Sequence, residues 1–138
     1  MRGNLEGRLA ERGLSARCRI LGRRTDIGDL MHASDVLLFV GRADGMEGMP
    51  GVLIEAAMVG LPVVAFDVAG VSEVVRDGES GSLVPWREVD GLAEATLRLF
   101  ADPALATRFA TNARRSASRF EIERVGDRYL DLYESLIA

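Results

Sequence analysis

The sequence predicts an α/β fold, in which helices flank a Rossmann-like parallel sheet. Two features lead to this prediction. Residues 36–40 and 62–66 are continuous apolar runs, which are typical of strands buried on both faces. Between them, a glycine-rich stretch leads into Pro50 and a short helical segment over residues 51–59, which Gly60 can end. A strand, a glycine-rich turn, a helix and a second strand form one βαβ unit, from which parallel sheets are built.

Further elements are expected ahead of this unit. The sequence predicts a helix over residues 4–12, a short strand over 19–21 and a helix over 26–33 that Asp26 is placed to cap. Cys18 is the only cysteine, so it has no partner for an internal disulfide. Since free cysteines are usually buried, we expect a reduced, buried thiol near the start of that strand.

The chain after the central unit is predicted to add one strand and several helices. Residues 72–76 predict a short helix, and residues 82–84 predict the last strand, whose end Trp86 is expected to cover. Residues 89–138 carry apolar side chains at helical spacing, which predicts helices that pack on the sheet. We therefore expect residues 1–138 to form one domain.

Length and composition limit the function. The chain has 138 residues, enough for a domain with a substantial core. Its 17 basic residues are dispersed among 21 acidic ones, so no basic stripe indicates a nucleic-acid partner. The few cysteine and histidine residues indicate no metal site. The first residues are polar, and no apolar run approaches the ~18 residues of a membrane span, so we expect a cytoplasmic protein.

Two acidic residues flank the start of the central helix. Glu47 lies in the turn ahead of it, and Glu55 lies within it, roughly 7–8 Å along the axis from Pro50. Between the two carboxylates lie the free backbone N–H groups of residues 49–52, which can donate to a diphosphate. Each carboxylate can accept hydrogen bonds from a sugar diol. This arrangement fits a ligand that has a diphosphate in its middle and a hydroxyl-rich group at each end.

The stretch EGMPGVLIEAAMVGLPVVA resembles the signature of the group 1 glycosyltransferases, which are retaining, use nucleotide sugars and consist of two Rossmann-like domains. Its mark is a Glu, seven residues, a second Glu, then Ala, a small residue, Gly and Pro-Val-Val. In this sequence those positions are Glu47, Glu55, Ala56, Gly60 and residues 62–64. The resemblance implies that the chain is the nucleotide-sugar-binding part of such an enzyme.

The resemblance also implies roles for individual residues. Glu47 would contact the transferred sugar as the catalytic residue, and Glu55 would hold the ribose of the nucleotide. Gly22 and Arg23 occupy the place of the loop that approaches the base, although charged turn residues such as Arg23 are usually only solvated. The diphosphate would lie over the opening turn of the helix, formed by Gly48, Met49, Pro50, Gly51 and Val52.

The resemblance covers nearly the whole chain, but only the later part of the C-terminal donor domain. The N-terminal acceptor domain, the first two strands of the donor domain and the family's Arg and Lys pair for the diphosphate have no counterpart. In the strand order 3-2-1-4-5-6, the strands over residues 19–21 and 36–40 would then have unpaired edges. We expect an acceptor domain in cis or in trans, or a second copy that closes the sheet. Peripheral membrane association stays open, because many relatives act on lipid-linked acceptors.

The resulting hypothesis is the donor half of a retaining, metal-independent glycosyltransferase of carbohydrate biosynthesis. It would transfer a hexosyl group from a UDP-, GDP- or similar nucleotide sugar to an unknown acceptor, without a further cofactor. The isolated chain would be inactive. One alternative is a nucleotide-sugar-binding module or subunit with no activity of its own. The other is a non-enzymatic α/β interaction domain, in which Glu47 and Glu55 are ordinary surface acids.

Overall fold

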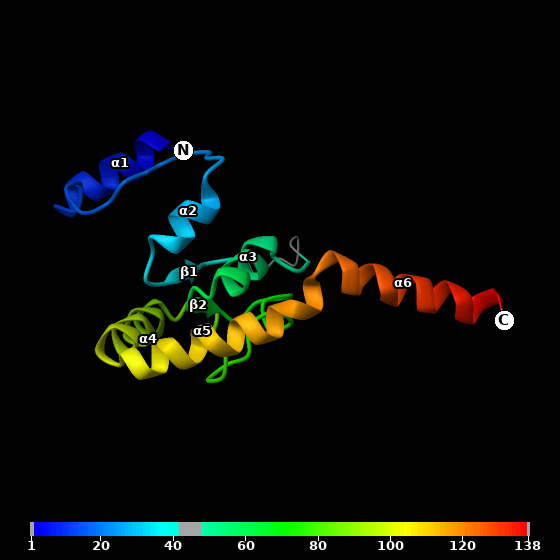
Figure 1. Ribbon diagram of the computed structural model, residues 1–138. Coiled ribbons are helices and arrows are strands. Elements are labelled where there is room, and N and C mark those ends of the chain that lie inside the picture. Colours follow the sequence, from blue (N-terminus) through cyan, green and yellow to red (C-terminus); the bar gives the residue numbers. More distant parts are fainter. Residues whose placement is uncertain (1, 42–47, 138) are drawn as a thin grey trace.

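A parallel β-sheet with the strand order β1-β2-β3 forms the centre of the protein (Figure 1). The computed structural model describes residues 2–41 and 48–137. Within this part of the chain, the strands are β1 (Leu37–Phe39), β2 (Val63–Phe66) and β3 (Gly81–Val84). The middle strand, β2, pairs in parallel with both neighbours, in a register that aligns Leu38, Val64 and Ser82. The parallel sheet that the sequence predicts is therefore confirmed.

Helix α3 (Gly51–Val59) connects β1 to β2 and completes the expected βαβ unit. The helix ends where Gly60 adopts a left-handed conformation with φ 70° and ψ 35°. There the Gly60 N–H donates to the carbonyls of Ala56 and Ala57. Because glycine reaches this conformation with little strain, the predicted helix stop is confirmed.

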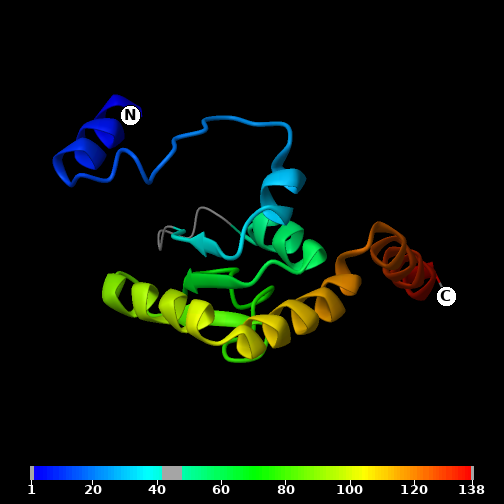
Figure 2. The same cartoon turned by 60° about the vertical axis from the view of Figure 1, so that its left-hand side comes forward.

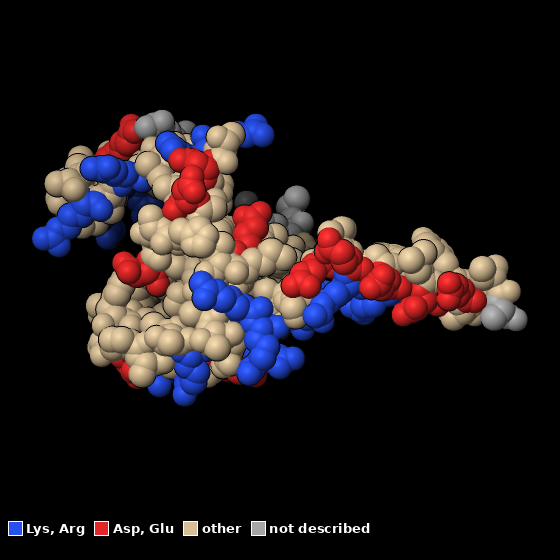
Figure 3. All heavy atoms as spheres, viewed as in Figure 1, with Lys and Arg blue, Asp and Glu red and all other residues tan. Residues whose placement is uncertain are grey.

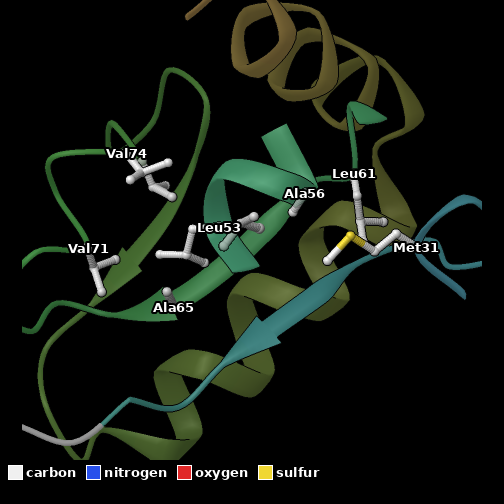
Figure 4. Close-up of a cluster of buried hydrophobic side chains, with 9 residues drawn as sticks. Met31, Leu53, Ala56, Leu61, Ala65, Val71 and Val74 are labelled. Carbon is white, nitrogen blue, oxygen red and sulfur yellow. The ribbon is translucent and has the colours of Figure 1, made fainter. Parts of the chain in front are cut away.

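One hydrophobic core lies between the sheet and α3 (Figure 4). Leu53 and Ala56 of α3 have no exposed surface, and they pack with Val63 and Ala65 of β2. Complete burial of a leucine side chain contributes about 1.5–3 kcal/mol, so this contact holds α3 firmly in place. The same core includes residues from other segments, namely Met31, Leu61, Val71, Val74 and Val75.

Helices α4 (Val89–Ala101) and α5 (Pro103–Ala117) cover the opposite face of the sheet. Alternate residues of a strand point to opposite faces, so Val64 and Phe66 lie in this second core rather than in the first. The helix residues that pack with them are Leu92, Leu99, Leu105 and Phe109. Between the helices, Asp102 caps α5 by accepting the Leu105 N–H at 2.9 Å. Helices thus flank the sheet on both faces, which confirms the predicted fold class.

The N-terminal region corrects part of the prediction. Helices α1 (Arg2–Glu11) and α2 (Ile27–His32) form close to the expected positions. Residues 19–21, however, form no strand, since no described strand lies beside them to pair with. As a consequence Cys18 is exposed rather than buried beside a strand. Figure 2 shows α1 standing away from the sheet, and no side chain of residues 3–25 is buried.

The segment between β2 and β3 also differs from the prediction. Residues 72–76 form turns rather than a helix, because only one turn closes, through bonds from the Val74 and Val75 N–H groups to the Val71 carbonyl. A single turn fixes too many dihedral angles to persist as a helix unless it is extended. Trp86 follows β3 and packs edge-to-face on Phe66 with ring centroids 5.5 Å apart, as expected for a residue that covers the strand ends.

The last helix, α6 (Ile122–Ile137), extends away from the rest of the molecule after the short 3-10 turn η1 (Ser118–Phe120), as Figures 1 and 2 show. In contrast to α4 and α5, it has no buried residue. Most of its apolar side chains, including Tyr129, Tyr133 and Leu136, are more than half exposed, and Val125 is partly buried. In the described residues, no helix has both the length and the apolar character that a membrane span requires.

A glycine substitution tests the end of α3. We expect Gly60→Ala to lower the free energy of unfolding by about 1–2 kcal/mol, because the left-handed conformation strains a residue with a Cβ atom. The added Cβ would also lie 2.7 Å from the guanidinium carbon of Arg114. Urea denaturation measures the change. Gly126→Ala, in the open middle of α6, is the control and should leave stability unchanged or raise it. Equal losses in both variants would contradict the assignment.

Candidate functional site

A cavity of about 450 Å³ lies at the carboxyl end of β1 and the start of α3. Parallel α/β sheets bind ligands at this end, because the loops that follow the strands diverge there. The cavity is lined by Phe39, the last residue of β1, and by the turn that leads into α3, which comprises Gly48, Met49, Pro50, Gly51 and Val52. The structure thus brings together all five residues that the sequence assigns to the opening turn.

The opening turn of α3 presents backbone donors. Pro50 lies immediately before the helix, one position earlier than a first helical residue, and no side chain caps the helix start. The first N–H groups of any α-helix have no partner within the helix. In α3 these donors belong to Gly51 and Val52, both of which line the cavity. They also form the positive end of the helix dipole, so the cavity favours an anion.

Gly70 shapes this cavity from a distant part of the chain. It adopts a φ of 81°, and a Cβ atom at this position would overlap the Gly48 carbonyl and lie 2.6 Å from its carbon atom. The turn after β2 therefore rests directly on the turn before α3. Sequence reasoning did not assign Gly70 to the site. The available signal was a glycine shortly after a buried strand, which does not say what the glycine contacts.

Glu55 lies about one turn further along α3, in a separate hollow. Its side chain is exposed and lines a second hollow of about 360 Å³ together with residues of the segment that leads into α2. The described lining comprises Thr25, Ile27, Gly28, Met31, Met58 and Val59. A carboxylate that faces an open, partly apolar hollow can accept hydrogen bonds from a diol whose remaining atoms pack on the apolar wall.

Arg23 lines an adjoining hollow of about 420 Å³ with Arg24, Thr25 and Asp26. Thr25 belongs to both this hollow and that of Glu55, so the two are neighbours. Asp26 does not cap α2 through its side chain, because its carboxylate pairs with Arg24 instead, with Nε and Oδ1 2.6 Å apart. This bond lowers the pKa of Asp26 and raises that of Arg24. The Arg24 side chain is thus held in an ion pair with Asp26.

Gly22, just ahead of this hollow, adopts a φ of 70°, which a glycine reaches with little strain. Glu47, the predicted catalytic residue, lies outside the described residues. Among the residues that the structure describes, no three His, Cys, Asp or Glu side chains gather as metal ligands would. The described site therefore consists of backbone donors, one carboxylate and the loop that carries Arg23.

The fold and the site define a parallel α/β domain with a cavity at the carboxyl end of β1, where the first turn of α3 presents backbone N–H donors. The chain belongs to the family of glycosyl transferases group 1, whose family model matches residues 2–102. This confirms the resemblance that the sequence analysis identified.

Relatives with known roles agree with this membership. The chain is 32% identical to LpsB of Rhizobium meliloti, a lipopolysaccharide core biosynthesis mannosyltransferase, over 96% of its own length and 38% of that protein. It is 31% identical to the phosphatidyl-myo-inositol mannosyltransferase of Mycobacterium leprae, over 90% of the chain and 33% of that protein. The chain thus spans little more than a third of these relatives.

The solved structures extend the comparison to the fold. The chain superimposes on Anabaena Alr3699/HepE in complex with UDP with a TM-score of 0.89 and 29% identity, covering 96% of this chain and 36% of that one. The complex of the same protein with UDP-glucose gives a TM-score of 0.85 and 28% identity. The present chain therefore has the fold of one part of these glycosyltransferases.

The contact between Gly70 and Gly48 can be tested by substitution. We expect Gly70→Ala to destabilise the protein by more than the ~1–2 kcal/mol of left-handed strain, because its Cβ also collides with the Gly48 backbone. NMR should show displaced amide signals from Gly48 to Val52. Gly78→Ala is the matched control, with a φ of 68° and open space around the added Cβ, and it should show the strain alone. Identical effects of the two changes would exclude the proposed contact.

Proposed function

We propose that this chain is the donor-binding region of a retaining glycosyltransferase and binds a nucleoside diphosphate sugar. The observation that carries the proposal is that α3 lines two different hollows, one at its first turn and one along its middle and last turn. The cavity of residues 48–52 offers backbone donors for a diphosphate, and the hollow of Glu55 offers a carboxylate for the ribose. A nucleotide sugar has these groups adjacent to one another.

The positions of the three hollows indicate which end of the ligand carries the base and which carries the sugar. With the ribose on Glu55, the base extends toward the segment of Arg23 and Thr25, whose hollow adjoins that of Glu55. Gly22 contributes the turn that lets the backbone of this segment approach the base. At the other end, the sugar lies beyond Gly48, next to the position of Glu47 in the chain. The complexes of the similar Anabaena protein with UDP and UDP-glucose support a ligand of this class.

The described residues contribute to transfer by stabilising the leaving group. When the bond between the sugar and the diphosphate breaks, negative charge develops on the diphosphate. The N–H groups of Gly51 and Val52, fixed at the positive end of α3, stabilise this charge without having to reorganise. In this proposal the reaction uses neither a metal nor a further cofactor, and Glu47 contacts the transferred sugar. The alternative is a module that binds the donor without transferring its sugar.

The acceptor would be bound by a second domain, in cis or in trans. The long helix α6 supports this part of the proposal, since it has no buried residue and most of its apolar side chains are exposed. The edge strand β1 is a second exposed apolar surface, because its Leu38 is 46% exposed although it belongs to the central sheet. Both features fit a chain whose apolar surfaces meet further protein.

Calorimetric titration with UDP and GDP tests the donor site. We expect one nucleotide to bind and Glu55→Ala to weaken it by about 1.5–3 kcal/mol, the scale of a hydrogen bond to a charged group. Glu94→Ala, which removes an exposed acid from the middle of α4, is the matched control and should leave the affinity unchanged.

The outcomes separate the candidate functions. Equal affinities of the Glu55 variant and the wild type would refute the ribose contact. A folded chain that binds neither nucleotide would refute donor binding by this region alone. Binding without release of the sugar from a UDP-sugar, even after addition of an acceptor domain, would favour a nucleotide-sugar-binding module without activity.

A further inference from the structure

A fourth cavity, of about 540 Å³, lies where α6 leaves the core. Its walls come from three segments, namely the turn before α3, the 3-10 turn η1 and the first half of α6. They comprise Met49, Arg119, Phe120, Val125, Arg128, Tyr129 and Leu132. Figure 3 shows acidic side chains along the length of α6, with basic side chains beside them near its start. The cavity belongs to none of the hollows described for the donor.

Arg119 forms a fixed wall of this cavity. Its guanidinium lies over the ring of Phe120, with its central carbon 4.6 Å from the ring centroid, and one terminal nitrogen donates to the Glu73 carbonyl. The Nε atom is buried and has no hydrogen-bond partner among the described residues. A buried donor without a partner is rare in folded proteins, since it loses its water without gaining a bond. In Arg119 the unpaired N–H belongs to a charged guanidinium, for which a missing hydrogen bond costs more than for a neutral group.

The charge of the cavity is also uncompensated. Among the described residues, neither Arg119 nor Arg128 forms an ion pair with a carboxylate, whereas the neighbouring Arg124 pairs with Glu121. The chain as a whole has more acidic than basic residues, so this absence does not reflect a shortage of acids. Two guanidinium groups that line one cavity without a carboxylate form a site for an oxyanion, because each can donate several hydrogen bonds.

The position of the cavity relates it to the donor. Met49 lines both this cavity and the cavity at the start of α3, so the two are adjacent. Glu55 and Thr25, which we assign to the nucleotide end, line a hollow that does not include Met49. The cavity of Arg119 and Arg128 is therefore next to the sugar end of the donor, where the acceptor must approach.

We propose that this cavity binds an oxyanion carried by the acceptor, a phosphate ester or a carboxylate, and thereby positions the acceptor beside the donor sugar. The inference rests on the proposed donor site for its orientation. Arg119, held by Phe120 and Glu73, is the preorganised half of the site, and Arg128, on the exposed surface of α6, is the half that adapts to the ligand.

NMR of the nitrogen-15-labelled chain, saturated with UDP, tests the oxyanion site. Inorganic phosphate and acetate are the probes, and the Nε–H signal of Arg119 is the reporter. We expect phosphate, acetate or both to shift this signal in a saturable way. Arg128→Gln should weaken that binding about tenfold, which is the scale of one lost charge-assisted hydrogen bond. Arg124→Gln removes the same charge from the same helix, outside the cavity lining, and should leave the binding unchanged.

Two results would overturn the proposal, an Arg119 signal that does not respond to either probe and a response that Arg128→Gln and Arg124→Gln weaken equally. The failure of the donor proposal has a different signature. In that case neither UDP nor GDP moves the amide signals of Gly51 and Val52, while the Arg119 response to the probes can still be measured. Stronger binding of phosphate than of acetate would assign the oxyanion to a phosphate ester.

Discussion

The burial of one face of α3 is the contact on which the rest of the structure depends. Leu53 and Ala56 are completely buried against β2, so the helix has one position over the sheet. From this position its first turn meets the end of β1, and its last turn meets α5, where Arg114 donates to the Val59 carbonyl at 2.7 Å. The site at the start of α3 is therefore held by packing rather than by its own loops.

A single helix can then serve two parts of a ligand. Its free N–H groups and its positive dipole end lie at the first turn, and Glu55 follows about one turn later. Neither feature identifies a nucleotide sugar by itself, since any helix has a first turn and exposed acids are common. In this structure the two features occupy separate hollows along one helix, the first turn with the Gly70 turn against Gly48, and Glu55 with α2 beside it.

Several apolar surfaces of the domain remain exposed to solvent. Among the described residues, the edge of β1 and most apolar side chains of α6 are exposed, and α1 stands away from the sheet. Burial of apolar surface stabilises a fold by roughly 25 cal/mol per Å², and the surface that stays in water does not contribute this free energy. The distribution of these surfaces suits a domain that completes itself against further protein, as expected for a chain that spans 36–38% of its relatives.

The sequence by itself determined the βαβ unit, because local chemistry decides each of its parts: apolar runs for buried strands, Pro50 ahead of the helix and Gly60 at its end. The spacing of Glu55 from the helix start followed in the same way. The prediction of a strand over residues 19–21 was wrong, because a strand needs a neighbouring strand to pair with, which a local sequence pattern does not reveal. Only the tertiary structure decided which segments meet: Gly70 on Gly48, Thr25 beside Glu55, and Arg119 with Arg128. These contacts join residues distant in the chain, and their geometry depends on how the whole core packs.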